Sequence, residues 1–181
     1  MAHPQQQQFM ESVRDRFPHK FSGVRVLDVG SLDINGNNRY LFTDAEYTGI
    51  DIGEGRNVDI VSRGHEFKSN KLFDVTISSE CFEHDEYWVV TFTNMVRLTK
   101  PEGMVVFSCA SANRPEHGTR RTSPQDSPFT SQIENDYYKN LNREDFEHFP
   151  LSDWFTEWEF IENRNPDDLY FWGIRSNYKI D

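Results

Sequence analysis

The sequence feature that most constrains this chain is a pair of apolar segments, one ending at a glycine and the other carrying a carboxylate at its end. Residues 24–29, Val-Arg-Val-Leu-Asp-Val, predict a buried strand that enters a tight turn at Gly30. Such strands are usually parallel and covered on both faces. Residues 46–52 predict a second strand with Asp51 near its end. Asp51 follows Gly30 by 21 residues, close to the spacing of about 20 at which a nucleoside-binding βαβ unit places the acid for the ribose hydroxyls.

The loop after the first strand lacks the glycines of a dinucleotide-binding fingerprint. Leu32 and Asp33 stand where small residues are needed for a pyrophosphate to approach the backbone. A diphosphate would also meet the carboxylate of Asp33, which disfavours a nicotinamide-dependent oxidoreductase. A nucleoside without phosphates, carrying cationic sulfonium and ammonium groups, tolerates acidic neighbours, and S-adenosylmethionine is such a molecule. The alternative is an ordinary α/β turn that binds no ligand, because single motifs carry a real false-positive risk.

Length and charge narrow the class of protein. The 181 residues are expected to form one domain, residues 1–181. The formal net charge of −11 repels phosphodiester backbones and anionic headgroups, so nucleic acid is a disfavoured partner and no membrane partner is expected. No apolar run approaches the length of a membrane span. The first residues lack the basic start and apolar core of a signal peptide, which predicts a cytoplasmic protein.

The two cysteines do not indicate a metal or disulfide site. Cys81 and Cys109 each stand in an apolar context without paired spacing, so both are expected to be reduced core thiols. We therefore predict no metal site. Nothing in the sequence indicates an oligomeric state.

Residues 1–23 predict an N-terminal helical extension. Phe9, Val13 and Phe17 follow a helical spacing that stops before Pro18, and this helix would lie across the sheet or over the mouth of a ligand site. Strands and helices then alternate, which predicts a parallel, doubly wound sheet. The expected elements are a short helix at 37–42, strands at 58–61 and 73–79, a helix at 85–100 and a strand at 104–109.

A polar segment follows the fifth predicted strand. Residues 110–128 are rich in Ser, Asn, Arg, Thr and Pro, and long loops of this kind are usually functional or else disordered. We assign residues 110–141 as a loop on the substrate side. Asn142 is expected to cap a following helix. Residues 154–161 and 169–176 predict two closing strands in an antiparallel hairpin.

Together these features resemble the class I S-adenosylmethionine-dependent methyltransferases of the small methyltransferase-domain type. The motifs that carry the resemblance are residues 26–30, 49–51, 78–80 and 98–104. The resemblance implies an α/β fold, a Rossmann-like doubly wound seven-stranded sheet that is mostly parallel with a C-terminal antiparallel hairpin. It also implies an enzyme with S-adenosyl-L-methionine as its cofactor. The sequence departs from the family in its glycine-poor first loop and at Glu102, which replaces a glycine of the usual Pro-Gly-Gly turn while Gly103 is expected to keep the permissive position.

The spacing and the resemblance together assign nine cofactor-binding residues. Each also has a plainer interpretation, as a turn glycine, a capping side chain or a solvated Arg or His. The nine are Gly30 and Ser31 at the methionyl part, Arg39 at its carboxylate, Asp51 at the ribose, Ile52 beside it, Gly64 and His65 at the adenine, and Ser79 and Glu80 at the pocket floor.

Methyl transfer is an in-line displacement at a sulfonium, so alignment of the reactants supplies much of its acceleration. A base is needed only for a hydroxyl or a protonated amine, and His84 and His117 are the predicted catalytic bases because imidazole titrates near neutral pH. Arg114, Arg120 and Arg121 are candidates for holding an anionic acceptor, with a solvated loop as the alternative. We therefore predict an S-adenosylmethionine-dependent methyltransferase that acts on a small polar or anionic acceptor. The alternative function is a non-catalytic methyltransferase-like binding module.

Overall fold

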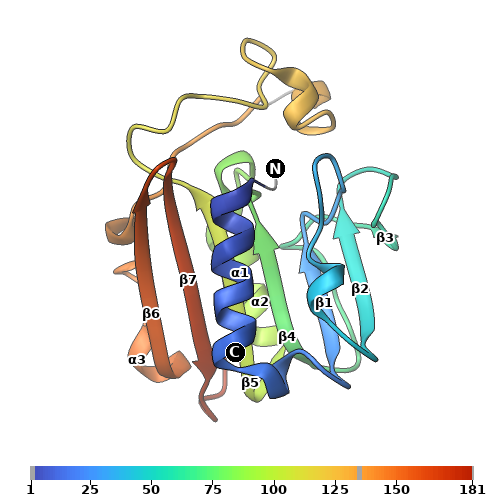
Figure 1. Cartoon of the computed structure of the whole chain (residues 1–181), viewed down its shortest axis with the longest axis vertical. Helices are drawn as coiled ribbons and strands as arrows, with labels where there is room; N and C mark the ends of the chain where they lie inside the picture. The colour runs from blue at the N-terminus through green and yellow to red at the C-terminus, as the bar shows by residue number, and fades with distance from the viewer. Residues whose placement is uncertain (1–2, 134–135, 181) are drawn as a thin grey trace.

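The computed structural model describes residues 3–133 and 136–180, which surround a seven-stranded sheet (Figure 1). The strand order is β3-β2-β1-β4-β5-β7-β6. Strands β1 to β5 pair in parallel, whereas β7 runs antiparallel to both β5 and β6. The predicted mostly parallel sheet with an antiparallel closing hairpin is therefore confirmed. The strands are β1 (Arg25–Val29), β2 (Glu46–Asp51), β3 (Ile60–Val61), β4 (Phe73–Ser79), β5 (Thr99–Ala110), β6 (Phe155–Arg164) and β7 (Asp167–Arg175).

Fewer helices join the strands than the alternating pattern predicts. In the described part of the chain, α2 (Trp88–Leu98) is the one α-helix that connects two consecutive parallel strands. The connection from β1 to β2 contains only the 3-10 helix η2 (Arg39–Leu41). Its turn-forming side chains explain this, because Asp33 accepts hydrogen bonds from the Gly36 N–H and the Asn37 side chain, both at 2.8 Å.

The N-terminal helix α1 (Pro4–Arg16) covers the front face of the sheet (Figure 1). Phe9, Met10 and Val13 are buried there, and the Phe9 ring stacks on Tyr170 of β7 with centroids 4.5 Å apart. The helix begins with a proline at its first turn and ends before Pro18, as predicted. This packing brings the start of α1 to the carboxyl ends of the central strands.

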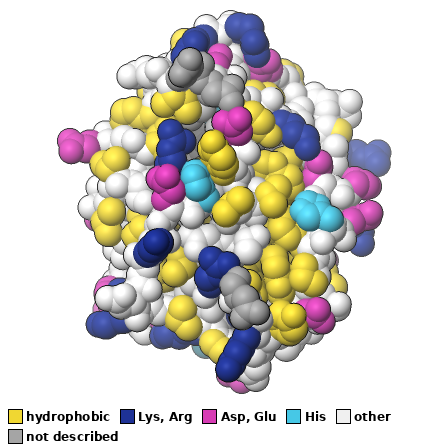
Figure 2. Space-filling model, turned by 180° about the vertical axis from the view of Figure 1, so that it is seen from behind, with side chains coloured by type: hydrophobic (Ala, Val, Ile, Leu, Met, Phe, Trp, Pro, Cys, Tyr) yellow, Lys and Arg dark blue, Asp and Glu magenta, His cyan; other side chains and the backbone are white. Residues whose placement is uncertain are grey.

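The back face of the sheet is covered by α2 and by the segment that contains η6 (Arg143–Phe146) and α3 (Leu151–Trp154). Its core is aromatic: Phe107 of β5 stacks on Phe171 of β7 and on Phe146, with centroids 5.0 Å apart in each pair. Asn142 forms a capping box with Asp145, as the sequence predicts for the start of a helix. From behind, the surface mixes hydrophobic side chains with acidic and basic ones (Figure 2).

Strand β5 begins earlier than expected, at Thr99. The Pro-Glu-Gly sequence is therefore part of the strand, with an irregularity in its pairing to β4 between Phe73 and Val75. The positive φ of this stretch is at Glu102 (63°) and not at Gly103, so the expectation that Gly103 keeps the permissive position was wrong. Gly103 is instead closely packed, because a Cβ there would lie 2.8 Å from the Asp74 carbonyl oxygen.

After β5 the chain crosses the carboxyl ends of the strands (Figure 1). This segment contains the short 3-10 helices η4 (Pro124–Asp126) and η5 (Thr130–Gln132). Among the described residues, every helix is too short or too polar to cross a membrane.

Candidate functional site

A cavity that is partly open to solvent lies at the carboxyl ends of β1, β2 and β4. Strand β1 pairs with β2 on one side and β4 on the other, so this is the point at which the strand order reverses. Ligands of open α/β sheets bind in the crevice at such a point. The start of α1 contributes Gln6 to the wall, and the segment after β5 contributes residues 126–130.

Seven of the nine predicted cofactor-binding residues line this cavity. They come from the ends of β1, β2 and β4 and from the loop after β3, which the topology brings together. The seven are Gly30, Ser31, Asp51, Ile52, Gly64, Ser79 and Glu80.

Gly30 is required by the backbone at the end of β1. Its φ is +77°, and a Cβ at this position would lie 2.5 Å from the Cys81 sulfur. The Gly30 N–H donates to the Ile50 carbonyl at 2.9 Å, which ties the turn to β2. The turn therefore presents bare backbone to the cavity.

Asp51 lies at the end of β2 with its carboxylate held in place by the backbone. One oxygen accepts from the Leu32 N–H at 3.0 Å and the other from the Ile52 N–H at 2.7 Å. Burial raises the pKa of Asp51, and the backbone N–H groups act in the opposite direction. Each carboxylate oxygen can accept more than one hydrogen bond, so Asp51 keeps acceptor capacity toward the cavity.

Arg39 and His65 do not line the cavity. The Arg39 guanidinium donates to the Asn57 side chain at 2.7 Å and pairs with Asp59 at 2.8 Å. His65 packs against the Tyr87 ring at 4.3 Å, although its neighbour Gly64 does line the wall. Partners within the protein therefore hold the Arg39 side chain away from the cavity in which it was predicted to contact a cofactor carboxylate.

Asp28 is a cavity residue that the sequence reasoning did not assign. It is buried in β1, accepts from the Tyr47 hydroxyl at 2.6 Å and leaves Oδ1 without a partner among the described residues. Burial raises the pKa of Asp28 from 3.8 to about 6. The position of Asp28 among the apolar residues of a predicted buried strand could have identified it, because an acid is seldom buried without a role.

Asp28 predicts a specific pH dependence of stability. Because its pKa is higher in the folded chain than in the unfolded one, the folded state holds more protons between about pH 4 and pH 6, and the contribution of Asp28 to stability falls as pH rises through that window. Asp28→Asn removes this loss, so its free energy of unfolding relative to wild type should rise by about 2 kcal/mol from pH 4 to pH 7. Urea unfolding of both proteins across this range measures it. A difference that does not change with pH would contradict the prediction.

The cavity wall is acidic. Six carboxylates line it and Arg63 is the one Lys or Arg side chain among the described lining residues; the acids are Asp28, Asp51, Glu80, Asp85, Glu86 and Asp126. Asp33, expected to repel a diphosphate, does not line the cavity, because it binds Gly36 and Asn37 and pairs with Arg56. The repulsion of phosphates predicted for Asp33 comes instead from the six lining carboxylates, which also favour a cationic ligand.

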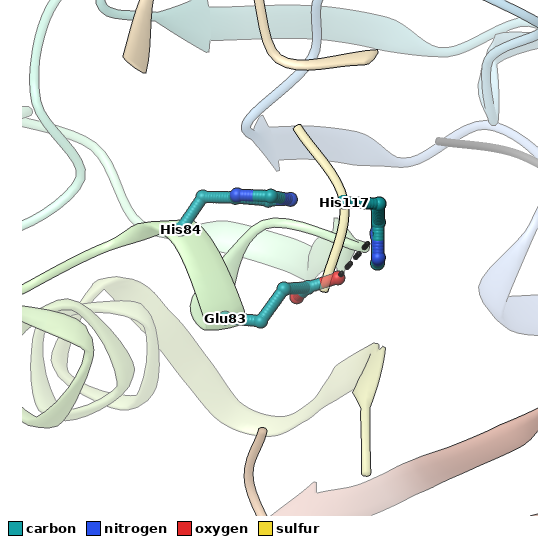
Figure 3. Close-up of side chains that lie close together, drawn as sticks. All are labelled: Glu83, His84 and His117. Carbon is teal, nitrogen blue, oxygen red and sulfur yellow. Dashed lines mark ion pairs between the residues drawn. The ribbon is translucent and has the colours of Figure 1, made fainter. Parts of the chain in front are cut away.

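The two predicted bases lie side by side, but only His84 lines the cavity. Their ring centroids are 5.3 Å apart and nearly perpendicular, with Glu83 beside them (Figure 3). Burial, with His117 close by, lowers the pKa of His84 to about 3. Burial also lowers the pKa of His117 and raises that of Glu83 to about 8. Both imidazoles are therefore neutral at physiological pH, and His84 is a weak proton acceptor.

The three arginines predicted to hold an anionic acceptor have partners within the protein. Arg114 pairs with the buried Asp168, and Arg121 pairs with Glu116 at 3.0 Å. Arg120 donates to backbone carbonyls of its own segment. None of the three lines the cavity, so their positions do not support the predicted role of holding an anionic acceptor.

A seven-stranded sheet of this order, mostly parallel with an antiparallel closing hairpin, matches the Rossmann-like methyltransferase fold. The methyltransferase domain family matches residues 1–176, and the chain belongs to that family. The predicted class, a class I S-adenosylmethionine-dependent methyltransferase, is thereby confirmed.

Solved structures share this fold at low sequence identity. The 1,6-didemethyltoxoflavin-N1-methyltransferase of Burkholderia thailandensis, solved with S-adenosylhomocysteine, is 14% identical with a TM-score of 0.61, over 98% of this chain and 92% of that one. The N-methyltransferase NodS of Bradyrhizobium japonicum is 14% identical with a TM-score of 0.60, over 98% and 100%. Phosphoethanolamine N-methyltransferase 2 of Haemonchus contortus, solved with S-adenosyl-L-methionine, is 15% identical with a TM-score of 0.65, over 94% of this chain and 53% of that one. No curated protein matches the chain.

Proposed function

We propose that this protein transfers the methyl group of S-adenosylmethionine to a small polar acceptor that is neutral or positively charged. The observation that carries the proposal is the acidic cavity at the switch point, with Asp51 fixed at the end of β2. A sulfonium and an ammonium are favoured by such a wall, whereas phosphates and anionic acceptors are repelled. The same acidity, with the net charge of −11, supports a small-molecule partner over a nucleic acid.

The residues at the carboxyl ends of the strands fit this cofactor. Asp51 would accept the ribose hydroxyls, and the free Oδ1 of Asp28 would accept from the ammonium group. Gly30 would allow the methionyl part to approach the backbone, and Ile52 and Gly64 would border the adenine. When bound, the cofactor supplies an electrophilic methyl group.

The acceptor side is formed by the segment after β5, which we propose as the substrate wall within a single domain of residues 1–181. Phe129 of this segment lies against Gly53, where a Cβ would come within 2.7 Å of the ring. Tyr137 and His84 line the same cavity. Because the lowered pKa makes His84 a weak base, we propose that alignment of the acceptor carries most of the acceleration.

Isothermal titration with S-adenosylhomocysteine tests the proposal. We expect saturable binding with a dissociation constant below about 1 mM, within the usual range for enzyme ligands, and no heat with the dinucleotide NAD⁺. Transfer from isotopically labelled S-adenosylmethionine to small amines and alcohols should follow. Absence of binding would contradict the proposal. Binding without transfer to any acceptor would favour the non-catalytic module instead.

A further inference from the structure

Glu83, His84 and His117 form a cluster beside the cavity (Figure 3). Glu83 and His84 belong to the 3-10 helix η3 (Phe82–His84), directly after β4, and His117 comes from the segment after β5. One nitrogen or oxygen from each side chain lies within 4.8 Å of the others. Donor atoms this close can converge on one ion after small side-chain movements, because metal–ligand bonds are about 2.1 Å long.

Among the described residues, the buried carboxyl group of Glu83 has no cationic side chain within hydrogen-bond distance. The residue is 0% exposed, and neither side-chain oxygen has a hydrogen-bond partner in the described part of the chain. Nε2 of His117 lies 3.9 Å from Oε1 of Glu83, which is too far for a hydrogen bond. A buried carboxylate is costly unless it is paired, protonated or bound to a metal.

The histidines are oriented as metal ligands are. Nδ1 of His117 lies 3.1 Å from the Pro115 carbonyl oxygen and 3.2 Å from the Tyr138 hydroxyl. Because a carbonyl oxygen can only accept, the tautomer with the proton on Nδ1 is the one that makes the Pro115 contact a hydrogen bond. This tautomer leaves a lone pair on Nε2, which faces Glu83 and has no hydrogen-bond partner among the described residues. A backbone carbonyl commonly fixes a ligating imidazole in this way. Nδ1 of His84 is also buried without a described partner.

We propose that Glu83, His84 and His117 bind a divalent transition-metal ion of the Zn²⁺ or Co²⁺ type. Two imidazoles and a carboxylate are a donor set that such ions favour. Three protein ligands leave at least one coordination position, and His84 places the ion at the cavity wall. The sequence expectation of no metal site missed this set because residues 83 and 117 meet only through the fold.

A second cluster, of His3, Glu80 and Asp168, is less suited to a cation. Asp168 already pairs with His3 at 2.8 Å and with Arg114, and it accepts from the Tyr170 hydroxyl at 3.0 Å. A permanently charged guanidinium beside the carboxylate repels a metal ion. His3 therefore serves to distinguish the two clusters in an experiment.

Titration of the chelator-treated full chain with Co²⁺, followed by visible absorption and calorimetry, tests the site. We expect one ion per chain in the wild type, and at least about tenfold weaker binding in Glu83→Gln and in His117→Gln. His19→Gln, at an exposed position away from the cluster, is the matched control and should bind as the wild type does. His3→Gln should also retain the ion.

Thermal unfolding gives a second readout, because Zn²⁺ should raise the melting temperature of the wild type and not that of His117→Gln. If Glu83→Gln fails to fold, His117→Gln decides alone. No ion in the wild type, undiminished binding in His117→Gln, or loss of the ion only in His3→Gln would each overturn the site. The measurement needs no S-adenosylmethionine, so its failure would leave the proposed methyl transfer unaffected.

Discussion

Asp51→Ala is expected to weaken binding of S-adenosylhomocysteine by about 1 to 3 kcal/mol, roughly a factor of 5 to 150 in the dissociation constant. The half-buried carboxylate at the end of β2 is held by backbone N–H groups, those of Leu32 and Ile52 among them, and it keeps further acceptor capacity toward the cavity. Removing it takes away a charge-assisted acceptor for the ribose hydroxyls. Isothermal titration of the purified variant measures the loss.

Two further variants separate this effect from a general loss of negative charge. Asp51→Asn keeps the shape of the side chain and should fall between wild type and alanine. Glu54→Ala removes an exposed carboxylate three residues along the chain and should bind as the wild type does. Equal weakening by Glu54→Ala and Asp51→Ala would mean that the overall field, and not a ribose contact, drives binding.

Gly30→Ala is expected to lower the free energy of unfolding by about 2 to 4 kcal/mol. Two costs add: the left-handed backbone at φ +77° disfavours a side chain, and the new Cβ would meet the Cys81 sulfur at 2.5 Å and its Cβ at 2.6 Å. Urea unfolding measures the loss.

Gly23→Ala is the matched control, because Gly23 has a similar φ of +66° with nothing within 4 Å of the added Cβ. It should show only the conformational cost of about 1 to 2 kcal/mol. If the two variants lose equal stability, the close approach to Cys81 has no energetic consequence.

The parts of the fold that follow from local patterns were predictable. Strand β1, strand β2 and the closing hairpin each have an apolar pattern bounded by turn residues, and the structure places them as expected. The connection after β1 was not, because the asparagines and Asp33 satisfy the backbone through side-chain hydrogen bonds, and a turn competes with a helix there.

The residues of the site also divide into those that the sequence could predict and those that it could not. Gly30, Asp51 and Ser79 were predictable as lining residues because strand ends in a parallel sheet converge. Arg39 and Arg114 were not, because a long cationic side chain binds whichever acid the fold brings near, here Asp59 and Asp168. Pairings of this kind join residues that are distant in the sequence.

The central claim is that Asp51 holds the ribose of S-adenosylmethionine at the end of β2. A crystal structure of the protein with S-adenosylhomocysteine tests it most directly. The account predicts both ribose hydroxyl oxygens within about 3.2 Å of the Asp51 carboxylate, with the adenosine in the acidic cavity. A ribose bound elsewhere, with the Asp51 carboxylate accepting only from backbone N–H groups such as those of Leu32 and Ile52, would contradict it.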